Sequence, residues 1–207
     1  MNRTTNFILC LIMKIGLFGG SFNPIHNGHL RLAEWIVNAG YVDCVWLMVS
    51  PHNPLKSQNG LLPEEVRYEL AAIACADVKG VEACNFEFGL ERPTYTWRTI
   101  EALRNAYPEH DFFLIIGGDN WLIFDKWAHY EMLLRTTEIL VYPRDGITED
   151  TMPYWTAMAK AVQVMRCAPL FPFSSTEVRE RLRNKDSVDD MVPQSVVNKL
   201  NELKVEF

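Results

Sequence analysis

The sequence lacks the features that mark metal-bound, redox-active and nucleic-acid-binding proteins. Its five cysteines are scattered and no Cys-x-x-Cys pair occurs, so neither a zinc site nor a redox motif is predicted. We expect reduced, buried thiols, as in a cytosolic protein. The chain has no excess of basic residues. It contains 20 Lys and Arg and 26 Asp and Glu, which give a net charge of −6. Nucleic-acid-binding surfaces are normally basic, so such a partner is not expected, although a local cluster of Arg and Lys could still bind a small anion.

An apolar run that could cross a membrane is also missing near the N-terminus. The run over residues 7–13 is too short to span a bilayer, Lys14 interrupts it, and no small-residue cleavage site follows. We therefore expect no membrane span, no secretory signal and a cytoplasmic protein. Because Met13 directly precedes a strand-like run, residues 1–12 are predicted to be an extension outside the fold. One domain is expected over 13–207, with a helical C-terminal part from about 174.

Apolar, strand-like runs alternate with amphipathic segments almost to the end of the chain. The runs lie near residues 14–18, 44–49, 81–86, 112–117, 138–142 and 162–166. The helical segments lie near 28–39, 63–76, 94–106, 130–135, 174–183 and 193–203. Strands separated by helices imply crossover connections, and hence a doubly wound, mostly parallel α/β sheet with C-terminal helices. Ligands bind such sheets at the carboxyl ends of the strands, so residues that follow strands are the candidates for a site.

The loop after the first strand-like run carries the first candidate site. Residues 19–29 have the sequence Gly-Gly-Ser-Phe-Asn-Pro-Ile-His-Asn-Gly-His. The glycine pair allows the backbone to approach a ligand closely, and Asn27 is expected to cap a helix whose first N–H groups then face an anion. His26 and His29 flank that helix start and can donate hydrogen bonds to a phosphate during its transfer. A metal site on the two histidines is the minor alternative, because no third ligand lies nearby.

A second candidate lies near the C-terminus, where residues 174–179 have the sequence Ser-Ser-Thr-Glu-Val-Arg. A capping box is predicted, in which Ser174 accepts from the N–H of Glu177 while the Glu177 side chain reaches back. From these residues alone, a well-capped helix is the simpler interpretation. The alternative is a second helix N-terminus that binds phosphate groups, with Arg179 as a forked cation one turn into the helix.

Together the two segments resemble the two signatures of the nucleotidyltransferase superfamily. The first signature, Gly-x-Phe-x-Gly-x-Phe-x-Pro-x-His-x-Gly-His, is met at every fixed position over residues 16–29. The second, Ser-[Ser/Thr]-Thr-x-[Ile/Val]-Arg, is met over 174–179. The superfamily is related in fold to class I aminoacyl-tRNA synthetases, but 207 residues with a net negative charge are too few for one of those.

Three further segments resemble the bacterial nicotinate-nucleotide adenylyltransferases within that superfamily. Residues 114–119 resemble the strand-ending Ile-Ile-Gly-x-Asp, residues 124–127 resemble Phe-x-x-Trp, and residues 92–96 resemble a Ser/Thr-Tyr-Thr turn that opens a helix. The resemblance covers about residues 13–205. It implies that ATP, as its Mg2+ complex, and nicotinate mononucleotide are the substrates, with no nucleic-acid or membrane partner and a monomer or small homo-oligomer.

The resemblance also assigns roles to individual residues. It implies that His26, His29 and Arg179 act in catalysis. The residues that it places against ATP are Gly19, Gly20, Ser21, Phe22, Gly117, Asp119, Ser174, Ser175 and Thr176. The residues that it places against nicotinate mononucleotide are Lys56, Tyr95, Thr96, Trp127 and Ala128. In this assignment the indole of Trp127 covers the pyridine ring and backbone N–H groups at Thr96 and Ala128 receive its carboxylate, and no protein ligands to a metal are predicted.

One segment departs from the family pattern, and other functions stay open. Where the family commonly has Pro-Pro-His-[Lys/Arg], this chain has Asn-Pro-Leu-Lys over 53–56, so the role of the histidine cannot be carried over to Leu55. The nearest alternative is a pantetheine-phosphate adenylyltransferase, which shares both signatures but should lack the Phe-x-x-Trp segment. Cytidylyl transfer to an alcohol phosphate would usually show an Arg-rich second signature. A non-catalytic nucleotide sensor would not need His26, His29 and Arg179.

Overall fold

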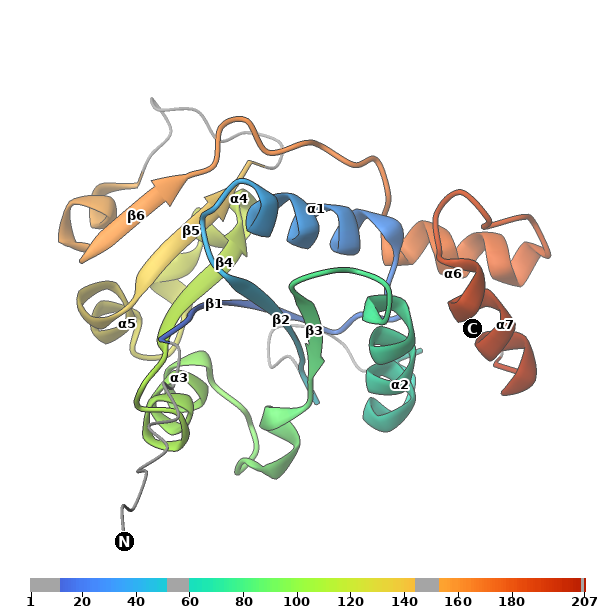
Figure 1. The fold of residues 1–207 in the computed structure, drawn as a ribbon, viewed down its shortest axis with the longest axis horizontal. Coiled ribbons are helices and arrows are strands. Elements are labelled where there is room, and N and C mark those ends of the chain that lie inside the picture. Colours follow the sequence, from blue (N-terminus) through green and yellow to red (C-terminus); the bar gives the residue numbers. More distant parts are fainter. Residues whose placement is uncertain (1–11, 52–59, 144–152, 206) are drawn as a thin grey trace, which may run out of the picture.

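Six parallel strands form one sheet at the centre of the molecule (Figure 1). In chain order they are β1 (Lys14–Gly20), β2 (Cys44–Val49), β3 (Val81–Cys84), β4 (Asp111–Gly117), β5 (Glu138–Tyr142) and β6 (Ala161–Val164). The computed structural model describes residues 12–51, 60–143, 153–205 and 207. The predicted phosphate contact Lys56, and all of the predicted N-terminal extension except Ile12, lie outside the described residues.

Helices cover both faces of this sheet. One face carries α1 (Asn27–Asn38) and α2 (Glu64–Cys75), and the other carries α3 (Thr96–Ala106), α4 (Gly118–Trp121) and α5 (Tyr130–Thr136). Two C-terminal helices, α6 (Ser175–Asn184) and α7 (Gln194–Glu202), lie beyond α2, and α7 packs on it (Figure 1). Short 3-10 helices occur at η1 (Phe86–Gly89), η2 (Phe124–Lys126) and η4 (Tyr154–Met158).

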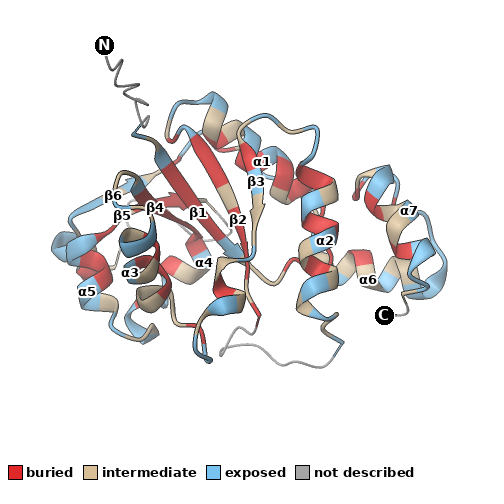
Figure 2. Ribbon diagram, turned by 60° about the horizontal axis from the view of Figure 1, so that its bottom comes forward, coloured by how far each residue is buried: buried red, intermediate tan, exposed pale blue. Residues whose placement is uncertain are grey.

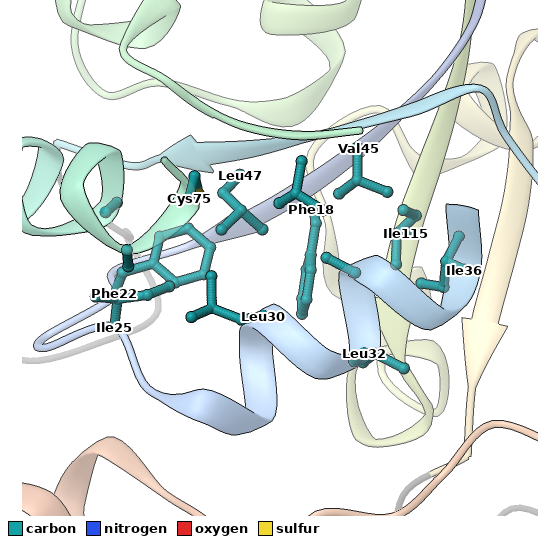
Figure 3. Packing of buried hydrophobic residues seen from close by; sticks show 14 of the residues in the cluster. Phe18, Phe22, Ile25, Leu30, Leu32, Ile36, Val45, Leu47, Cys75 and Ile115 are labelled. Atoms are coloured by element: carbon teal, nitrogen blue, oxygen red, sulfur yellow. The ribbon is translucent and has the colours of Figure 1, made fainter. Parts of the chain in front are cut away.

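Alternating side chains of the central strands fill two hydrophobic clusters, one on each face. From β1, Ile15 and Leu17 join the cluster under α3 and α5, whereas Phe18 joins the cluster under α1 and α2. Figure 3 shows Phe18 packed between the strands and the apolar side of α1, near Leu30 and Leu32. The central strands are buried on both sides, as Figure 2 shows. Burial on both faces explains why these strands are near-continuous apolar runs in the sequence.

The strand order β3-β2-β1-β4-β5-β6 confirms the doubly wound α/β fold that the alternating pattern predicts. Successive crossovers run outward from β1 toward β3 and from β4 toward β6, so the winding reverses between β1 and β4. In such a sheet the carboxyl ends of the two central strands border a crevice where ligands bind. The first signature runs from the end of β1 through the loop that follows it, and the Ile-Ile-Gly-x-Asp segment lies at the end of β4 and the start of α4.

Some element boundaries differ from the sequence expectation. The third strand ends at Cys84 rather than at residue 86, because the chain turns there into η1. Helix α3 begins at Thr96 rather than at residue 94, because Tyr95 is still extended, with φ −90° and ψ 139°. The short helices α4, η2 and η4 were not predicted, since three to five residues are too few to show helical periodicity.

Candidate active site

Two adjoining cavities lie at the carboxyl ends of the central strands. Cavity A, of about 350 Å3, is bordered by the start of α3 and the segment around Trp127. Cavity B, of about 490 Å3, is bordered by the loop after β1 and the start of α6. The two cavities share the glycine pair and Ser21 at the end of β1, so together they form one continuous depression across the switch point.

The histidine pair forms one wall of cavity B. His26 is the N-cap residue of α1, with φ −144° and ψ 167°, and His29 lies one turn further on. Their rings stack with centroids 3.6 Å apart, and the His29 ring also meets the edge of Phe22 at 5.0 Å. The backbone N–H of His26 donates to Nδ1 of His29 at 3.4 Å, which places the proton of the neutral His29 ring on Nε2. The packing thus fixes both imidazoles at a helix N-terminus.

Asn27 does not cap α1, contrary to the sequence expectation, because His26 occupies the N-cap position. The Asn27 side chain is turned toward the segment before α7, where its Nδ2 donates to the carbonyl of Asp190 at 2.9 Å. Its backbone N–H donates to the carbonyl of Met191 at 2.7 Å. Asn27 therefore ties the start of α1 to the C-terminal part of the chain, whereas His26 and His29 form a capping box at the N-terminus of α1.

The first turn of α6 forms the opposite wall of cavity B and is attached to the loop after β1. The Ser175 hydroxyl donates to the carbonyl of Pro24 at 3.0 Å, and Nη1 of Arg179 donates to the carbonyl of Asn23 at 2.8 Å. Nη2 of Arg179 donates to Oγ1 of Thr176 at 3.2 Å. Burial lowers the pKa of Arg179, with a further lowering from the nearby charge of Arg183. These bonds aim a forked cation into the cavity from a fixed position.

Only half of the predicted capping box forms at α6. Oγ of Ser174 accepts from the backbone N–H of Glu177 at 3.1 Å, as expected. The Glu177 carboxylate instead accepts from Nη2 of Arg181, one turn further along the helix, at 3.0 Å. The Glu177 carboxylate is therefore paired along the helix with Arg181 rather than with the backbone of Ser174.

Cavity A combines an aromatic wall with an uncapped helix start. Trp127 is half-buried and its ring packs against Phe124, with centroids 5.0 Å apart. No side chain caps the N-terminus of α3 at Tyr95, so the first N–H groups of this helix are not satisfied by a capping side chain. An uncapped N-terminus attracts an anion through those N–H groups and through the helix dipole. The cavity can therefore hold a flat ring that carries an anionic substituent.

Glu87 is a residue of cavity A that sequence reasoning missed. It is 6% exposed and is the one acidic side chain among the described residues that line this cavity. Its carboxylate accepts from the hydroxyls of Thr99 at 2.8 Å and Thr94 at 3.2 Å. Burial raises the pKa of the Glu87 carboxyl, and hydrogen bonds from Thr99, Ser50 and Thr94 offset part of that rise. The carboxylate thus orders the turn before α3.

Arg67 is a second residue that the sequence did not single out. Its side chain is 1% exposed and donates to four backbone carbonyls: Ser21 at 2.7 Å, Ser50 at 2.8 Å, Leu62 at 2.9 Å and Pro51 at 3.1 Å. Burial lowers the pKa of its guanidinium. The planar group with five donors is suited to joining the loops after β1 and β2, and it brings a positive charge close behind the loop shared by both cavities.

Most of the predicted site residues lie in these two cavities. Lining cavity B are Gly19, Gly20, Ser21, Phe22, His26, His29, Ser174, Ser175, Thr176 and Arg179. Lining cavity A are Gly19, Gly20, Ser21, Tyr95, Thr96, Gly117, Trp127 and Ala128. Gly117, predicted to contact ATP, therefore lines cavity A and not cavity B, whereas Lys56 lies outside the described residues.

Asp119 is exposed on α4 and is not among the described residues that line either cavity. Its carboxylate lies against Gly117, where a Cβ would collide with Oδ1 of Asp119 and come within 3.0 Å of the Tyr142 hydroxyl. Gly117 is needed because these two side chains approach its backbone so closely. The following residue, Asn120, lines both cavities and was not predicted.

Among the residues that the structure describes, there is neither a metal-binding cluster nor a membrane-spanning helix. No group of three or more His, Cys, Asp or Glu side chains there is arranged to hold a metal ion. Within the same residues, no helix is both long enough and apolar enough to cross a membrane.

Comparison with known protein families and relatives agrees with the geometry. The Cytidylyltransferase-like family profile matches residues 17–181. A Bacteroides fragilis protein named probable nicotinate-nucleotide adenylyltransferase is 44% identical over 169 residues, which are 82% of each chain. A protein with the same name from Bacteroides thetaiotaomicron is 42% identical over 178 residues, or 85% of each chain.

A solved structure is similar over nearly the whole chain. The Plasmodium falciparum nicotinic acid mononucleotide adenylyltransferase in complex with NaAD superposes with a TM-score of 0.76. The match covers 93% of this chain and 96% of that one, at 17% sequence identity. At this identity the similarity shows that the fold is shared.

Proposed function

The chain belongs to the nicotinate-nucleotide adenylyltransferase family, and from that membership and the site geometry we propose the reaction and the residues that carry it. The enzyme transfers the adenylyl group of ATP to nicotinate mononucleotide and releases pyrophosphate, a step of NAD biosynthesis. The product is nicotinate adenine dinucleotide. The observation that supports this proposal best is the pair of adjoining cavities, one lined by phosphate-binding groups and the other by an aromatic wall and a helix N-terminus.

The reaction needs no covalent intermediate on the protein. A phosphate oxygen of nicotinate mononucleotide attacks the α-phosphorus of ATP, and the bond from that phosphorus to the β-phosphate oxygen breaks as pyrophosphate leaves with the electron pair. The attacking phosphate is already anionic, so no proton has to be removed and no general base is required. Catalysis then consists of alignment of the two substrates and stabilisation of charge on the transferred group.

Cavity B binds ATP in this proposal. The N-terminus of α1 with His26 and His29 stabilises the α-phosphate as its charge develops during transfer. Arg179 and the first turn of α6 hold the β- and γ-phosphates and then the leaving pyrophosphate. ATP enters as its Mg2+ complex, in which the ion is held mainly by phosphate oxygens and water. The stacked histidines and the bonds from α6 to the loop after β1 support this division of roles, because they fix both donor groups in place.

Cavity A binds the pyridine mononucleotide. Trp127 covers the ring, and the carboxylate is received by backbone N–H groups at Thr96, the first residue of α3, and at Ala128. Small anionic substrates are compatible with the net charge of −6, because the positive groups of the site are local. A cytoplasmic location and a monomer or small homo-oligomer stay predictions.

Release of pyrophosphate tests the proposal. The protein is incubated with ATP and Mg2+ together with nicotinate mononucleotide, nicotinamide mononucleotide or phosphopantetheine, with a control that lacks any acceptor. We expect the fastest release with nicotinate mononucleotide and no release above background without acceptor. Fastest release with phosphopantetheine would instead assign the chain to that sister activity. Absence of release with every acceptor would mean that the site binds nucleotides without transferring them.

A further inference from the structure

The junction between the two cavities includes residues to which the sequence analysis assigned no role. Six described residues line both cavities: Phe18, Gly19, Gly20, Ser21, Asn120 and Tyr142. If ATP lies in cavity B and the mononucleotide in cavity A, the acceptor phosphate and the α-phosphorus meet at this junction. Of these six described residues, Ser21, Asn120 and Tyr142 have side chains that can form hydrogen bonds, and the last two were not predicted.

Tyr142 is held in place by packing on two sides. It is the last residue of β5, directly opposite Gly117 in the register with β4. Its ring meets the edge of the buried Phe18 ring, with centroids 5.6 Å apart. The missing side chain at Gly117 leaves room for the phenol, because a Cβ there would come within 3.0 Å of the hydroxyl oxygen. The hydroxyl therefore has a defined position at the carboxyl ends of β4 and β5.

Asn120 is held by the rigid turn on which it lies. It belongs to α4, which follows β4 without a gap, and the next residue, Trp121, is fully buried. The backbone carbonyl of Asn120 accepts from the N–H of Ile123 at 3.3 Å, which closes the turn. Asn120 is half-buried and is among the residues that line both cavities.

We propose that Tyr142 and Asn120 bind and orient the attacking phosphate of the acceptor mononucleotide, an inference that rests on the proposed adenylyl transfer. The direction of attack supports this assignment. Arg179 and the first turn of α6 line cavity B but not cavity A among the described residues, so the pyrophosphate leaves on that side. In-line displacement requires the nucleophile to approach from the opposite side, which is the junction with cavity A.

The chemistry of the two side chains fits that task. A phenol hydroxyl and an amide N–H are neutral donors that bind phosphate oxygens directionally. Neutral donors orient the nucleophile without strongly withdrawing its negative charge, whereas the cationic Arg179 stabilises the group that leaves. In this proposal, Tyr142 and Asn120 orient the nucleophile on one side of the α-phosphorus, and Arg179 stabilises the leaving group on the other side.

Tyr142→Phe, which removes only the hydroxyl, tests the proposal, and Asn120→Ala is the second variant. Each should lower kcat/KM for nicotinate mononucleotide by at least ~10-fold, as expected for a lost hydrogen bond to a charged group. The Kd of a non-hydrolysable ATP analogue should stay within ~2-fold of wild type, since both residues act on the other substrate. Tyr41→Phe is the matched control, because that half-buried tyrosine lines neither cavity and packs against Trp35.

A loss of kcat/KM in Tyr142→Phe that is smaller than ~10-fold overturns the assignment. A loss of affinity for the ATP analogue that equals the loss of kcat/KM also overturns it, because it would indicate a general structural role. Nicotinate riboside, which lacks the phosphate, gives a further measurement as an inhibitor of wild type and variants. Its inhibition constant should not change if the two residues contact the phosphate alone. A wild-type protein that uses neither pyridine mononucleotide would refute the proposed function itself, whereas a fully active Tyr142→Phe refutes only the junction assignment.

Discussion

At the scale of single residues, buried polar side chains set the geometry of the site by fixing the backbone segments that line it. Arg67 joins the loops after β1 and β2 through four backbone carbonyls. Glu87 orders the turn before α3 through two threonine hydroxyls. Neither needs to touch substrate, yet each fixes a backbone segment that lines a cavity. Such groups are stable when buried only because their hydrogen bonds are made, which makes the segments rigid.

Replacing His29 tests the most direct catalytic assignment. His29→Ala should lower kcat by about 10²–10³, as expected when a donor to the transferred phosphate is lost. The melting temperature should change little, because the ring is half-buried at the edge of the cavity. Steady-state kinetics and thermal unfolding provide the two measurements. His110→Ala, at a histidine that lines neither cavity, is the control, and near-wild-type turnover in a folded His29→Ala protein would remove this residue from the mechanism.

Glu87→Gln should change how stability depends on pH. Burial raises the folded-state pKa of Glu87 above its ordinary value of 4.5, so above that pH the folded protein holds a proton that the unfolded chain releases. Glu87 therefore contributes most to the free energy of unfolding when the pH is below its unfolded-state pKa. This contribution falls as the pH rises, and it is lost as the pH passes the folded-state pKa. Each unit of elevation corresponds to about 1.4 kcal/mol.

Glutamine does not titrate, so the variant should gain stability relative to wild type between about pH 4.5 and about pH 7.5. Denaturant unfolding at both pH values measures the difference. A difference that stays constant with pH, or that reverses, would show that the buried carboxyl is not held toward its neutral form.

At the scale of elements, α6 connects the two signature segments into one unit. Ser175 and Arg179 on this helix donate to consecutive carbonyls of the loop after β1, those of Pro24 and Asn23. The first turn of α6 therefore cannot shift without moving the loop that leads to the histidine pair. In the proposed mechanism, recognition of the leaving phosphates and alignment of the α-phosphate are thus mechanically linked.

Arg179→Ala should affect the two substrates unequally. We expect the KM for ATP to rise by about 10-fold and kcat to fall, whereas the KM for the mononucleotide stays within about 3-fold. The reason is that Arg179 lines cavity B alone among the described parts of the site. Arg183→Ala, one turn further along the same helix and exposed, is the matched control. Equal increases in both KM values would indicate that Arg179 acts on the fold and not on ATP.

The sequence predicted the elements that have a repeating pattern and missed those that depend on contacts between distant segments. All six strands and the long helices follow from apolar periodicity, and the two signatures locate the histidine pair and the start of α6. Glu87 was missed because its partners lie 7 and 12 residues away in the sequence and only the folded turn brings them together. Arg67 was missed because its partners are backbone carbonyls, which leave no pattern in the sequence. The Asn27 side chain was expected to cap α1, but its partner lies 163 residues away.

At the scale of the whole molecule, the strand order brings distant segments to one edge of the sheet. The Ser175 hydroxyl and the Pro24 carbonyl are 151 residues apart in the sequence and form a hydrogen bond of 3.0 Å. The loop after β1 and the start of α4, which directly follows β4, lie close together because the winding of the chain reverses between β1 and β4. The two cavities are therefore a consequence of topology, and the side chains that line them decide the chemistry.

Removing residues 1–12 should leave kcat and the melting temperature unchanged within error. The first strand begins at Lys14, and Met13 already packs against the cluster under α3 and α5, whereas Ile12 is 70% exposed. The shortened protein is compared with the full chain by thermal unfolding and pyrophosphate release. Insolubility or loss of activity would show that the segment contributes to the structure.

Preference for the acid over the amide follows from how cavity A presents its donors. In the proposed site, a carboxylate makes charge-assisted hydrogen bonds to backbone N–H groups at Thr96 and Ala128 and gains from the dipole of α3. An amide turns its own NH2 group toward at least one of those donors, and an unpaired buried donor costs about 1–3 kcal/mol. Glu87 lies in the same cavity, but its carboxylate already accepts from the hydroxyls of Thr94 and Thr99.

The ratio of kcat/KM values for nicotinate and nicotinamide mononucleotide, measured with saturating ATP and Mg2+, tests this account most directly. The geometry of cavity A predicts that the acid is preferred by at least ~10-fold, and by more if several donors converge on the carboxylate. Trp127→Ala should weaken both acceptors through loss of stacking without reversing the preference. Comparable kcat/KM values for the two mononucleotides in the wild-type enzyme would contradict the assignment of the nicotinate site.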